Sequence, residues 1–469
     1  MKKDSVNMGY VVFLSVVAAI GGILFGYDTA VISGTTEIVK AQFGLSTGLE
    51  GWFVGCALIG SIIGVLTAGM MSDFLGRKKT MLIAALMFSI SAIGCALCGN
   101  FSQLVAYRMI GGFGIGVVSI VSPIYISEVA VAEKRGTLVS LYQLAITVGF
   151  LVAYLANYLV LKQADLTLSG SPERLSEPLS VRLWNSEYWR GMLGLETIPD
   201  LLFLIVIFFI PESPRWLIVK GRDSQAAGIL RRIYGSGEEA DHQMALTRAS
   251  IAGEVKSEWK TLLEPGIRTA VIAGSCIAIL GQFMGVNAVL YYGPKIFQDA
   301  GLSGEGSMFS TVLVGVVNML TTIIALLIID KVGRKQLVWW GVGGMIVCLL
   351  AIGAWFALGT LPTAFLLVFF LLYVFCTAIS ISAVVFVLLS EMYPNRVRGL
   401  AMSVAGFALW VGTYLIGQLT PWMLENLTPA GTFFLFAFMC VPYLYIMWKY
   451  IPETTGKTLE EIETYWKTR

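Results

Sequence analysis

The sequence predicts an all-α membrane protein with twelve transmembrane helices in two related six-helix bundles. The chain has 469 residues, of which 57% are hydrophobic and 13% are charged, and its mean hydropathy is +0.77. Soluble domains carry about 25% charged residues, so half that fraction points to a membrane protein. Twelve apolar stretches, and three motifs that each occur twice, complete the evidence for this fold class.

Each of the twelve apolar stretches is long enough, at about 20 residues, to cross the ~30 Å hydrocarbon core of a bilayer as a helix. They lie near 9–34, 51–71, 80–100, 103–127, 137–160 and 191–210, and then near 267–298, 307–329, 337–358, 363–390, 400–424 and 431–451. The first stretch runs into Asp28 without a cleavage site, so we expect it to remain as a span. Between the halves, "GRDSQAAGILRRIYG" has a helical spacing of Ala, Ile and Leu, which predicts short amphipathic helices on the membrane surface.

The distribution of Lys and Arg predicts the orientation. Twenty-five of the 32 basic residues fall at the termini or in loops on the terminal side, six fall on the other side, and Arg108 falls inside a span. Loops rich in Lys and Arg stay in the cytoplasm. We therefore expect a multi-pass plasma-membrane protein with both termini cytoplasmic, and the short tails and loops fit a bacterial inner membrane.

Three motifs repeat between the halves. "SDFLGRKK" (72–79) recurs as "IDKVGRKQ" (329–336), "SEVAVAEKRG" (127–136) recurs as "SEMYPNRVRG" (390–399), and "PESPR" (211–215) is echoed by "PETTGK" (452–457). Each motif falls at a predicted cytoplasmic helix end, at the same ordinal position in its half. We therefore expect an N-terminal bundle (1–211), a cytoplasmic linker (212–266) and a C-terminal bundle with a short tail (267–469), related by a pseudo-twofold axis along the membrane normal.

Together these motifs resemble the sugar porters of the major facilitator superfamily over essentially the whole chain. The similarity also rests on "PESPRWL" (211–217), "GQFMGVNAVLYYGPKIF" (281–297) and "PETTGKTLEEIE" (452–463). Both the bacterial proton-coupled pentose symporters and the animal glucose facilitators of this family are similar to the chain. The resemblance implies the major facilitator fold, a small-molecule sugar as cargo, a monomer in the lipid bilayer, and no cofactor.

Asp28 in "FGYDTAVISG" is energetically unfavourable in a span, since the insertion of an Asp at the bilayer centre costs about 2.5–3.5 kcal/mol on insertion scales. It lies about six residues from the external end of the first span, and Arg108 lies about five residues from the external start of the fourth. At 1.5 Å per residue both are roughly 8–9 Å below the outer boundary, so we expect them to pair in the bundle interior. The pair could also serve only to pin two helices together.

The resemblance assigns roles to these charges. Asp28 and Arg108 match the proton-coupling pair of the family's symporters, whereas uniporters commonly have a neutral residue at the acid position. Glu196 in "GLETIPD" matches a carboxylate that tunes this region. Asp200, one turn further along, stands where the family usually has a small apolar residue.

A sugar site needs uncharged amides, which both donate and accept hydrogen bonds, and aromatic rings against the apolar ring faces. Candidate amides within the spans are Gln143, Gln282, Asn287 and Asn318, although a single amide of this kind could equally join two helices. The resemblance adds the aromatic residues Phe25, Phe386 and Trp410 around the sugar, and Tyr291 and Tyr292 as an outer lid.

Three positions depart from the family pattern: Gly281 replaces a Gln, Phe386 in "SAVVF" replaces a Trp, and Leu409 replaces a polar residue. Fewer donors and acceptors in the site would leave a sugar hydroxyl unpaired, which costs about 1–3 kcal/mol. We therefore expect a sugar with fewer or differently placed hydroxyls than glucose, such as a pentose like xylose or a deoxyhexose.

Charged residues at the predicted cytoplasmic helix ends could form a gate that holds the inner side shut. Such a network could equally be positive-inside charge with incidental partners, because exposed ion pairs contribute only about 0–1 kcal/mol each. The candidates are Asp73, Arg77, Glu128, Arg135, Glu212 and Arg215 in the first half, and Asp330, Arg334, Glu391, Arg398 and Glu453 in the second.

Other function classes fit less well. The sequence contains no nucleophile–base set, phosphate loop or metal-ligand cluster, so we expect neither an enzyme nor a metal site. All seven cysteines lie in apolar runs, and His242 is the single histidine. Nothing indicates a nucleic-acid partner. A sugar sensor would usually carry a longer cytoplasmic tail. Passive sugar uniport by the same fold is the nearest alternative to proton symport.

Overall fold

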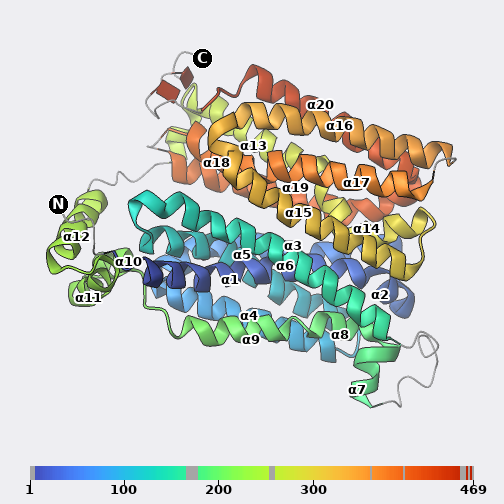
Figure 1. Cartoon of the computed structure of the whole chain (residues 1–469), viewed down its shortest axis with the longest axis horizontal. Coiled ribbons are helices and arrows are strands. Elements are labelled where there is room, and N and C mark those ends of the chain that lie inside the picture. The colour runs from blue at the N-terminus through green and yellow to red at the C-terminus, as the bar shows by residue number, and fades with distance from the viewer. Residues whose placement is uncertain are drawn as a thin grey trace. The chain divides into compact units, whose positions relative to one another are not determined.

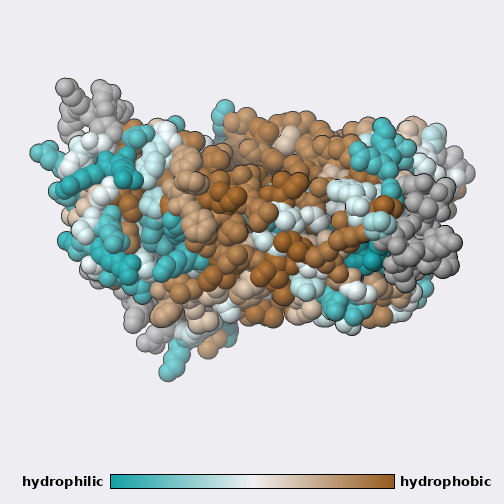
Figure 2. Space-filling view, turned by 90° about the horizontal axis from the view of Figure 1, so that it is seen from below, coloured by the Kyte–Doolittle hydropathy of each residue, from teal (hydrophilic) through white to brown (hydrophobic). Residues whose placement is uncertain are grey.

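The computed structural model describes residues 6–164, 178–252, 259–359, 362–394, 397–454, 461–462 and 465–466, except for the side chain of Asp330. All regular elements within these residues are helical (Figure 1). Eleven of the described segments are long and apolar enough to cross a membrane. On the face shown in Figure 2, hydrophobic residues gather over the middle and hydrophilic residues gather towards the two ends. The predicted all-α membrane fold with short additional helices is confirmed.

Five of the six predicted spans of the first half are long helices. Gly76 separates two of them with a φ of 96°, and a side chain at this position would clash with the Glu212 carboxylate, so the sharp turn requires glycine. The helices are α1 Met8–Val31, α3 Thr47–Leu75, α4 Arg77–Leu97, α5 Phe101–Val129 and α6 Arg135–Gln163, with the short α2 Thr36–Phe43 between the first two.

The sixth predicted span differs, because it consists of two shorter helices, α8 Tyr188–Gly194 and α9 Thr197–Ile207. Pro199 explains the break: it has no N–H to donate to the carbonyl of Leu195, so one continuous helix cannot form. Before the break, the residues from α7 (Leu179–Val181) to α8 are held by a buried carboxylate, Glu187.

Arg182 Nη2 and Arg190 Nε both donate to Glu187 Oε2, at 2.5 Å and 2.7 Å. Gln42 donates to the other carboxylate oxygen at 2.5 Å, which ties α2 to this segment. Burial by itself would raise the pKa of Glu187, but the hydrogen bonds from the two arginines outweigh it and hold the pKa below its ordinary value. The charged form of Glu187 therefore fixes the start of the sixth span.

The polar interval forms the short helices expected from its sequence: α10 Pro214–Val219, α11 Asp223–Tyr234 and α12 Gly237–Ala252. Along α11 the buried residues are Ala226, Leu230 and Ile233, which is the spacing of one helical face. The three helices pack together (Figure 1) around Trp216 and Leu217.

In the second half, the seventh and tenth predicted spans are interrupted inside the membrane. The helices are α13 Ile267–Phe283, α14 Val286–Asp299, α15 Gly304–Val332, α16 Arg334–Leu358, α17 Thr363–Thr377, α18 Ala383–Met392, α19 Arg398–Asn426 and α20 Thr428–Lys449. A π-helical turn, Ala378–Ser382, joins α17 to α18.

The break in the seventh span lies at Gly285, which has a φ of 89° and packs against the ring of Phe436 so closely that a side chain there would clash. Breaking a helix in lipid exposes backbone groups that need new partners. The Tyr373 hydroxyl donates to the freed carbonyl of Met284 at 2.7 Å. The neighbouring helix therefore pins the break that separates α13 from α14.

Packing divides the chain into two compact units, whose boundaries differ from those of the repeated motifs. Unit 1 comprises 1–29, 59–150 and 193–256, and unit 2 comprises 30–58, 151–192 and 257–469. The predicted division into bundles 1–211 and 267–469 stays a prediction. Unit 2 joins the predicted external ends of α1, α3 and α6 to α14, α15 and α19.

An ion-pair cluster within unit 2 holds some of these external ends together. Glu50 of α3 is fully buried, and its two carboxylate oxygens meet Lys295 of α14 and Lys40 of α2, each at 2.7 Å. Lys295 also meets Glu37 at 3.1 Å. Nearby, the Tyr154 hydroxyl of α6 donates to the Leu290 carbonyl of α14 at 3.0 Å. Helix α14 is thus tied to α2, α3 and α6 by polar contacts.

We expect Glu50→Gln to lower the free energy of unfolding by about 1–3 kcal/mol. A broken buried ion pair costs about 3–5 kcal/mol, and the loss is smaller here because Lys40 is one-third exposed. Thermal unfolding of the purified protein in detergent measures the change, with Glu238→Gln on the exposed surface of α12 as the control. Equal stability of both variants would contradict the role of this cluster.

Candidate functional site

The centre of the candidate site is the ion pair between Asp28 and Arg108, which lies inside unit 1. Asp28 lies one turn before the end of α1 and is 1% exposed, and Arg108 lies in the second turn of α5 and is 3% exposed. Arg108 Nη1 donates to Asp28 Oδ1 and, at 3.4 Å, to the Asp28 backbone carbonyl. Asp28 and Arg108 were predicted to meet because their predicted depths in the membrane are equal, and in the structure they are in contact.

Close helix packing around this pair keeps water away. Helix α5 runs against α4, and Gly111 of α5 lies so near Ser91 of α4 that a side chain at 111 would clash with the Ser91 hydroxyl. A side chain at Gly111 would also lie within 3.5 Å of Asp28 Oδ2. In this dry environment an ionised carboxylate needs a charged or hydrogen-bonded partner, and Arg108 supplies it.

Two further carboxyl groups lie near the pair, both from the broken sixth span. Glu196 lies at the break between α8 and α9 and is 3% exposed, and Asp200 follows one turn later and is fully buried. Glu196 interacts electrostatically with Asp28, Asp200 and Arg108, and Asp200 interacts with Asp28. The site therefore contains three acids and one guanidinium group.

The candidate sugar-binding amides of the seventh span meet at its break, in unit 2. Asn287, in the first turn of α14, donates from Nδ2 to Gln282 Oε1 of α13 at 2.6 Å. The Thr413 hydroxyl of α19 shares its one hydrogen between the same oxygen, at 3.1 Å, and the Leu409 carbonyl, at 2.9 Å. These contacts orient the Gln282 amide so that its N–H group is directed away from Asn287 and Thr413 and can bind a ligand.

The remaining predicted sugar-site residues of unit 2 differ in exposure. Trp410 lies one turn before Thr413 on α19 and is 8% exposed, and Asn318 on α15 is equally buried. Tyr291 and Tyr292 of α14 are buried, and the Tyr292 hydroxyl donates to the Gly417 carbonyl of α19 at 2.8 Å. Phe386 on α18 is half exposed.

The two other predicted sugar-site residues, Phe25 and Gln143, belong to unit 1. Both are partly buried, on α1 and α6. These helices pack with almost no separation, because Gly26 of α1 lies on the backbone of α6 at Ile146, where a side chain would clash. Small residues of this kind allow transmembrane helices to approach closely.

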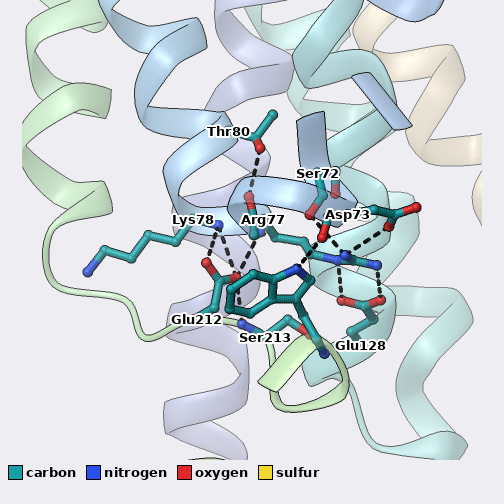
Figure 3. Close-up of polar contacts among 10 residues, drawn as sticks. Ser72, Asp73, Arg77, Lys78, Thr80, Glu128, Glu212 and Ser213 are labelled. Carbon is teal, nitrogen blue, oxygen red and sulfur yellow. Dashed lines mark hydrogen bonds and ion pairs between the residues drawn. The ribbon is translucent and has the colours of Figure 1, made fainter. Parts of the chain in front are cut away.

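Four of the six predicted gate residues of the first half, Asp73, Arg77, Glu128 and Glu212, form a connected network in unit 1 (Figure 3). Arg77, at the start of α4, makes two parallel hydrogen bonds of 2.9 Å to the Glu128 carboxylate at the end of α5. Asp73 lies 3.3 Å from the same guanidinium group and is largely exposed. Glu212 accepts hydrogen bonds from the backbone N–H groups of Arg77 and Lys78, at 2.8 Å and 3.1 Å, which caps α4.

Unit 2 repeats this arrangement with the matching residues. Arg334 at the start of α16 lies 3.1 Å from the Glu391 carboxylate, and Glu453 accepts a hydrogen bond from the Lys335 backbone N–H at 3.2 Å. Gly333 has a φ of 99°, like Gly76 in unit 1. The repeated motifs therefore fold into the same local structure twice.

The other predicted gate residues differ in exposure. Arg135 is exposed at the start of α6, and Arg215 and Arg398 are partly buried. Arg398 donates to the Tyr393 carbonyl at 3.4 Å. The side chain of Asp330 lies outside the described residues.

Sequence reasoning missed two groups of residues. The Glu50–Lys295 pair was missed because its members are 245 residues apart and lie at span ends, where charged residues are ordinary. Thr413 was missed because Thr is common in membrane helices. Its position one turn after Trp410 on the same helix face was the available signal.

Comparison with known proteins places the chain in a family. The model of the sugar (and other) transporter family matches residues 14–466. The D-xylose-proton symporter of Escherichia coli strain K12 is 36% identical to it, over 98% of this chain and 96% of the symporter. The arabinose-proton symporter of Bacillus subtilis strain 168 is 37% identical, with the same coverage.

A solved structure shares the fold as well. The xylose transporter XylE from E. coli, in a partially occluded inward-open conformation, matches with a TM-score of 0.83 and 35% identity, over 96% of this chain and 100% of that one. These proteins are membrane transporters and not enzymes, and the resemblance inferred from the motifs is confirmed. The chain belongs to the sugar porter family of the major facilitator superfamily.

Proposed function

We propose that this protein imports a monosaccharide together with a proton by alternating access. The buried Asp28–Arg108 ion pair is the observation that carries the proposal. A purely structural pair could be replaced by apolar residues of similar volume at little cost or with a gain in stability. An acid that must switch between charged and neutral forms has no apolar substitute. The names of two relatives, which are proton symporters for xylose and arabinose, agree with this reading.

The coupling follows from the energetics of the pair. When the site faces the outside, external water hydrates Asp28 and delivers a proton to its carboxylate. The neutral acid no longer attracts Arg108, so the helices that carry the two residues, α1 and α5, can change their packing. On the cytoplasmic side the proton leaves, because fewer protons are available there, and the ion pair forms again. Sugar binding and proton binding are linked because both favour the occluded state.

The polar contacts of each side act as latches in this cycle. Glu50, Lys40 and Lys295 tie α14, which carries Tyr291 and Tyr292, to the external ends of α2 and α3. These contacts must break before the tyrosine lid can open outward. On the predicted cytoplasmic side, the Arg77–Glu128 and Arg334–Glu391 pairs fix the helix ends from which the inner gate is built. Both termini lie on this side, and the protein works as a monomer.

The cargo is a pentose or a deoxyhexose. Gln282, Asn287 and Asn318 supply hydrogen bonds, and Trp410 supplies an apolar face. Gly281, Leu409 and the half-exposed Phe386 offer no polar group where the family pattern has one. A sugar hydroxyl that faces these apolar residues has no hydrogen-bond partner, and this disfavours the binding of glucose.

Asp28→Asn separates proton symport from passive uniport. We expect the variant, reconstituted in vesicles, to exchange labelled xylose between the two sides within about twofold of the wild-type rate. It should lose accumulation against a concentration gradient, because Asn carries no titratable proton. Glu238→Gln is the matched control and should accumulate sugar like the wild type.

Accumulation by Asp28→Asn would overturn the coupling role of the acid. If the variant loses both sugar exchange and accumulation, the ion pair has only a structural role.

The substrate class is tested by competition between sugars. With labelled xylose as the tracer, pentoses and 6-deoxyhexoses should inhibit uptake at concentrations about tenfold lower than glucose, since one unpaired hydroxyl costs about 1–3 kcal/mol. Leu409→Asn, which restores a polar residue beside Trp410, should narrow this difference. Inhibition by glucose at a lower concentration than by every pentose and deoxyhexose would contradict the assignment.

A further inference from the structure

Asp200 is a buried acid whose side chain makes no hydrogen bond within the described part of the chain. It lies in the first turn of α9 and is fully buried, and neither of its carboxylate oxygens has a hydrogen-bond partner among the described residues. A carboxyl group that stabilises a fold is normally paired or hydrogen-bonded. Burial of the Asp200 carboxyl group is therefore unfavourable, and no hydrogen bond or ion pair of the described residues offsets it. In a membrane span, a buried acid of this kind points to a function.

The groups around Asp200 come from several elements. Helix α9 packs against α4, and the ring of Phe203, one turn beyond Asp200, lies where a side chain at Gly21 of α1 would touch it. The titratable and charged groups of this cluster are Tyr27 and Asp28 on α1, Cys95 on α4, Arg108 on α5, and Glu196 at the break before α9.

Charge balance determines how many protons this cluster holds. Arg108 is its cation, and it pairs with Asp28. An isolated ionised carboxylate in a dry interior is so unfavourable that the group takes up a proton instead. With Asp28 ionised, Glu196 and Asp200 are therefore both protonated whenever the cluster is closed to water. No three acidic, Cys or His side chains of the described chain are placed to bind a metal ion, so a proton is the ligand to be considered.

The position of Asp200 indicates the direction in which its proton could leave. From Glu196, which interacts electrostatically with Asp28 and Arg108, the chain advances four residues to Asp200, or about 6 Å along the helix axis. The same helix continues towards Glu212, which caps α4 at the predicted cytoplasmic end. Asp200 therefore lies between the coupling acid and the inner side.

We propose that Asp200 is a proton relay through which the coupling proton leaves Asp28 for the cytoplasm. The inference rests on the proposed symport. In the inward-facing state, the O–H bond of Asp200 breaks and its proton passes to cytoplasmic water. The proton on Asp28 then moves to the Asp200 carboxylate, and the Asp28 carboxylate pairs again with Arg108. One proton enters from outside and one leaves inside, and Asp200 is neutral in every closed state.

The relay predicts a split between two measured rates in vesicles. Counterflow exchange of labelled xylose needs no change of protonation, so Asp200→Asn should keep it within about twofold of the wild type. Net uptake driven by a pH gradient needs proton release, and we expect it to slow at least about tenfold, since positioned proton transfer contributes about 10²–10⁴-fold. The ratio of protons to sugar should not change. Asp200→Glu, which restores the acid, should recover most of the net rate.

Each outcome decides between the possibilities. Equal net uptake by Asp200→Asn and the wild type would overturn the relay and leave proton symport intact. Loss of counterflow in both Asp200→Asn and Asp200→Ser would make the residue structural and overturn the relay as well. Absence of proton-coupled uptake in the wild type would instead refute the proposed function, and with it the relay.

Discussion

The requirement that a buried charge be matched organises this protein. Asp28 and Arg108 are both almost completely buried and come from helices α1 and α5, so each would destabilise the fold without the other. Their contact depends on close packing, in which Gly111 brings α5 against Ser91 of α4. The broken sixth span adds Glu196 and Asp200 to the same region. This region contains three acids and one cation, so it has no net charge only when two of the acids are protonated.

Three predicted spans are interrupted, and candidate functional residues lie close to each interruption. The sixth span breaks beside Glu196, the seventh between Gln282 and Asn287, and the tenth at a π-helical turn just before Phe386. Irregular backbone inside a membrane needs local partners. The Tyr373 hydroxyl supplies one at Met284 in the seventh span. In the sixth span Pro199 cannot donate to the Leu195 carbonyl, which accepts a hydrogen bond from the Ile198 N–H at 3.1 Å instead. Glu196 and the amides of Gln282 and Asn287 lie beside these breaks.

Much of this arrangement could be predicted from the sequence because its signals are local. Hydropathy gave the spans, repeated motifs gave the matching networks at Arg77 and Arg334, and helical rise gave the common depth of Asp28 and Arg108. The break at Gly285 was not predicted, since glycines are frequent in membrane helices and only the contact with Phe436 shows that this one is obligatory. The Glu50–Lys295 pair was also beyond sequence reasoning, because tertiary packing alone brings its two helices together.

The central claim is that sugar moves together with a proton that binds at Asp28. The most direct test is the external pH of de-energised cells or right-side-out vesicles when sugar is added. If the account is correct, addition of a transported pentose makes the weakly buffered medium more alkaline in proportion to the sugar taken up, and a protonophore abolishes the signal. Uptake of the same sugar without any change in external pH would contradict the account and leave a passive carrier.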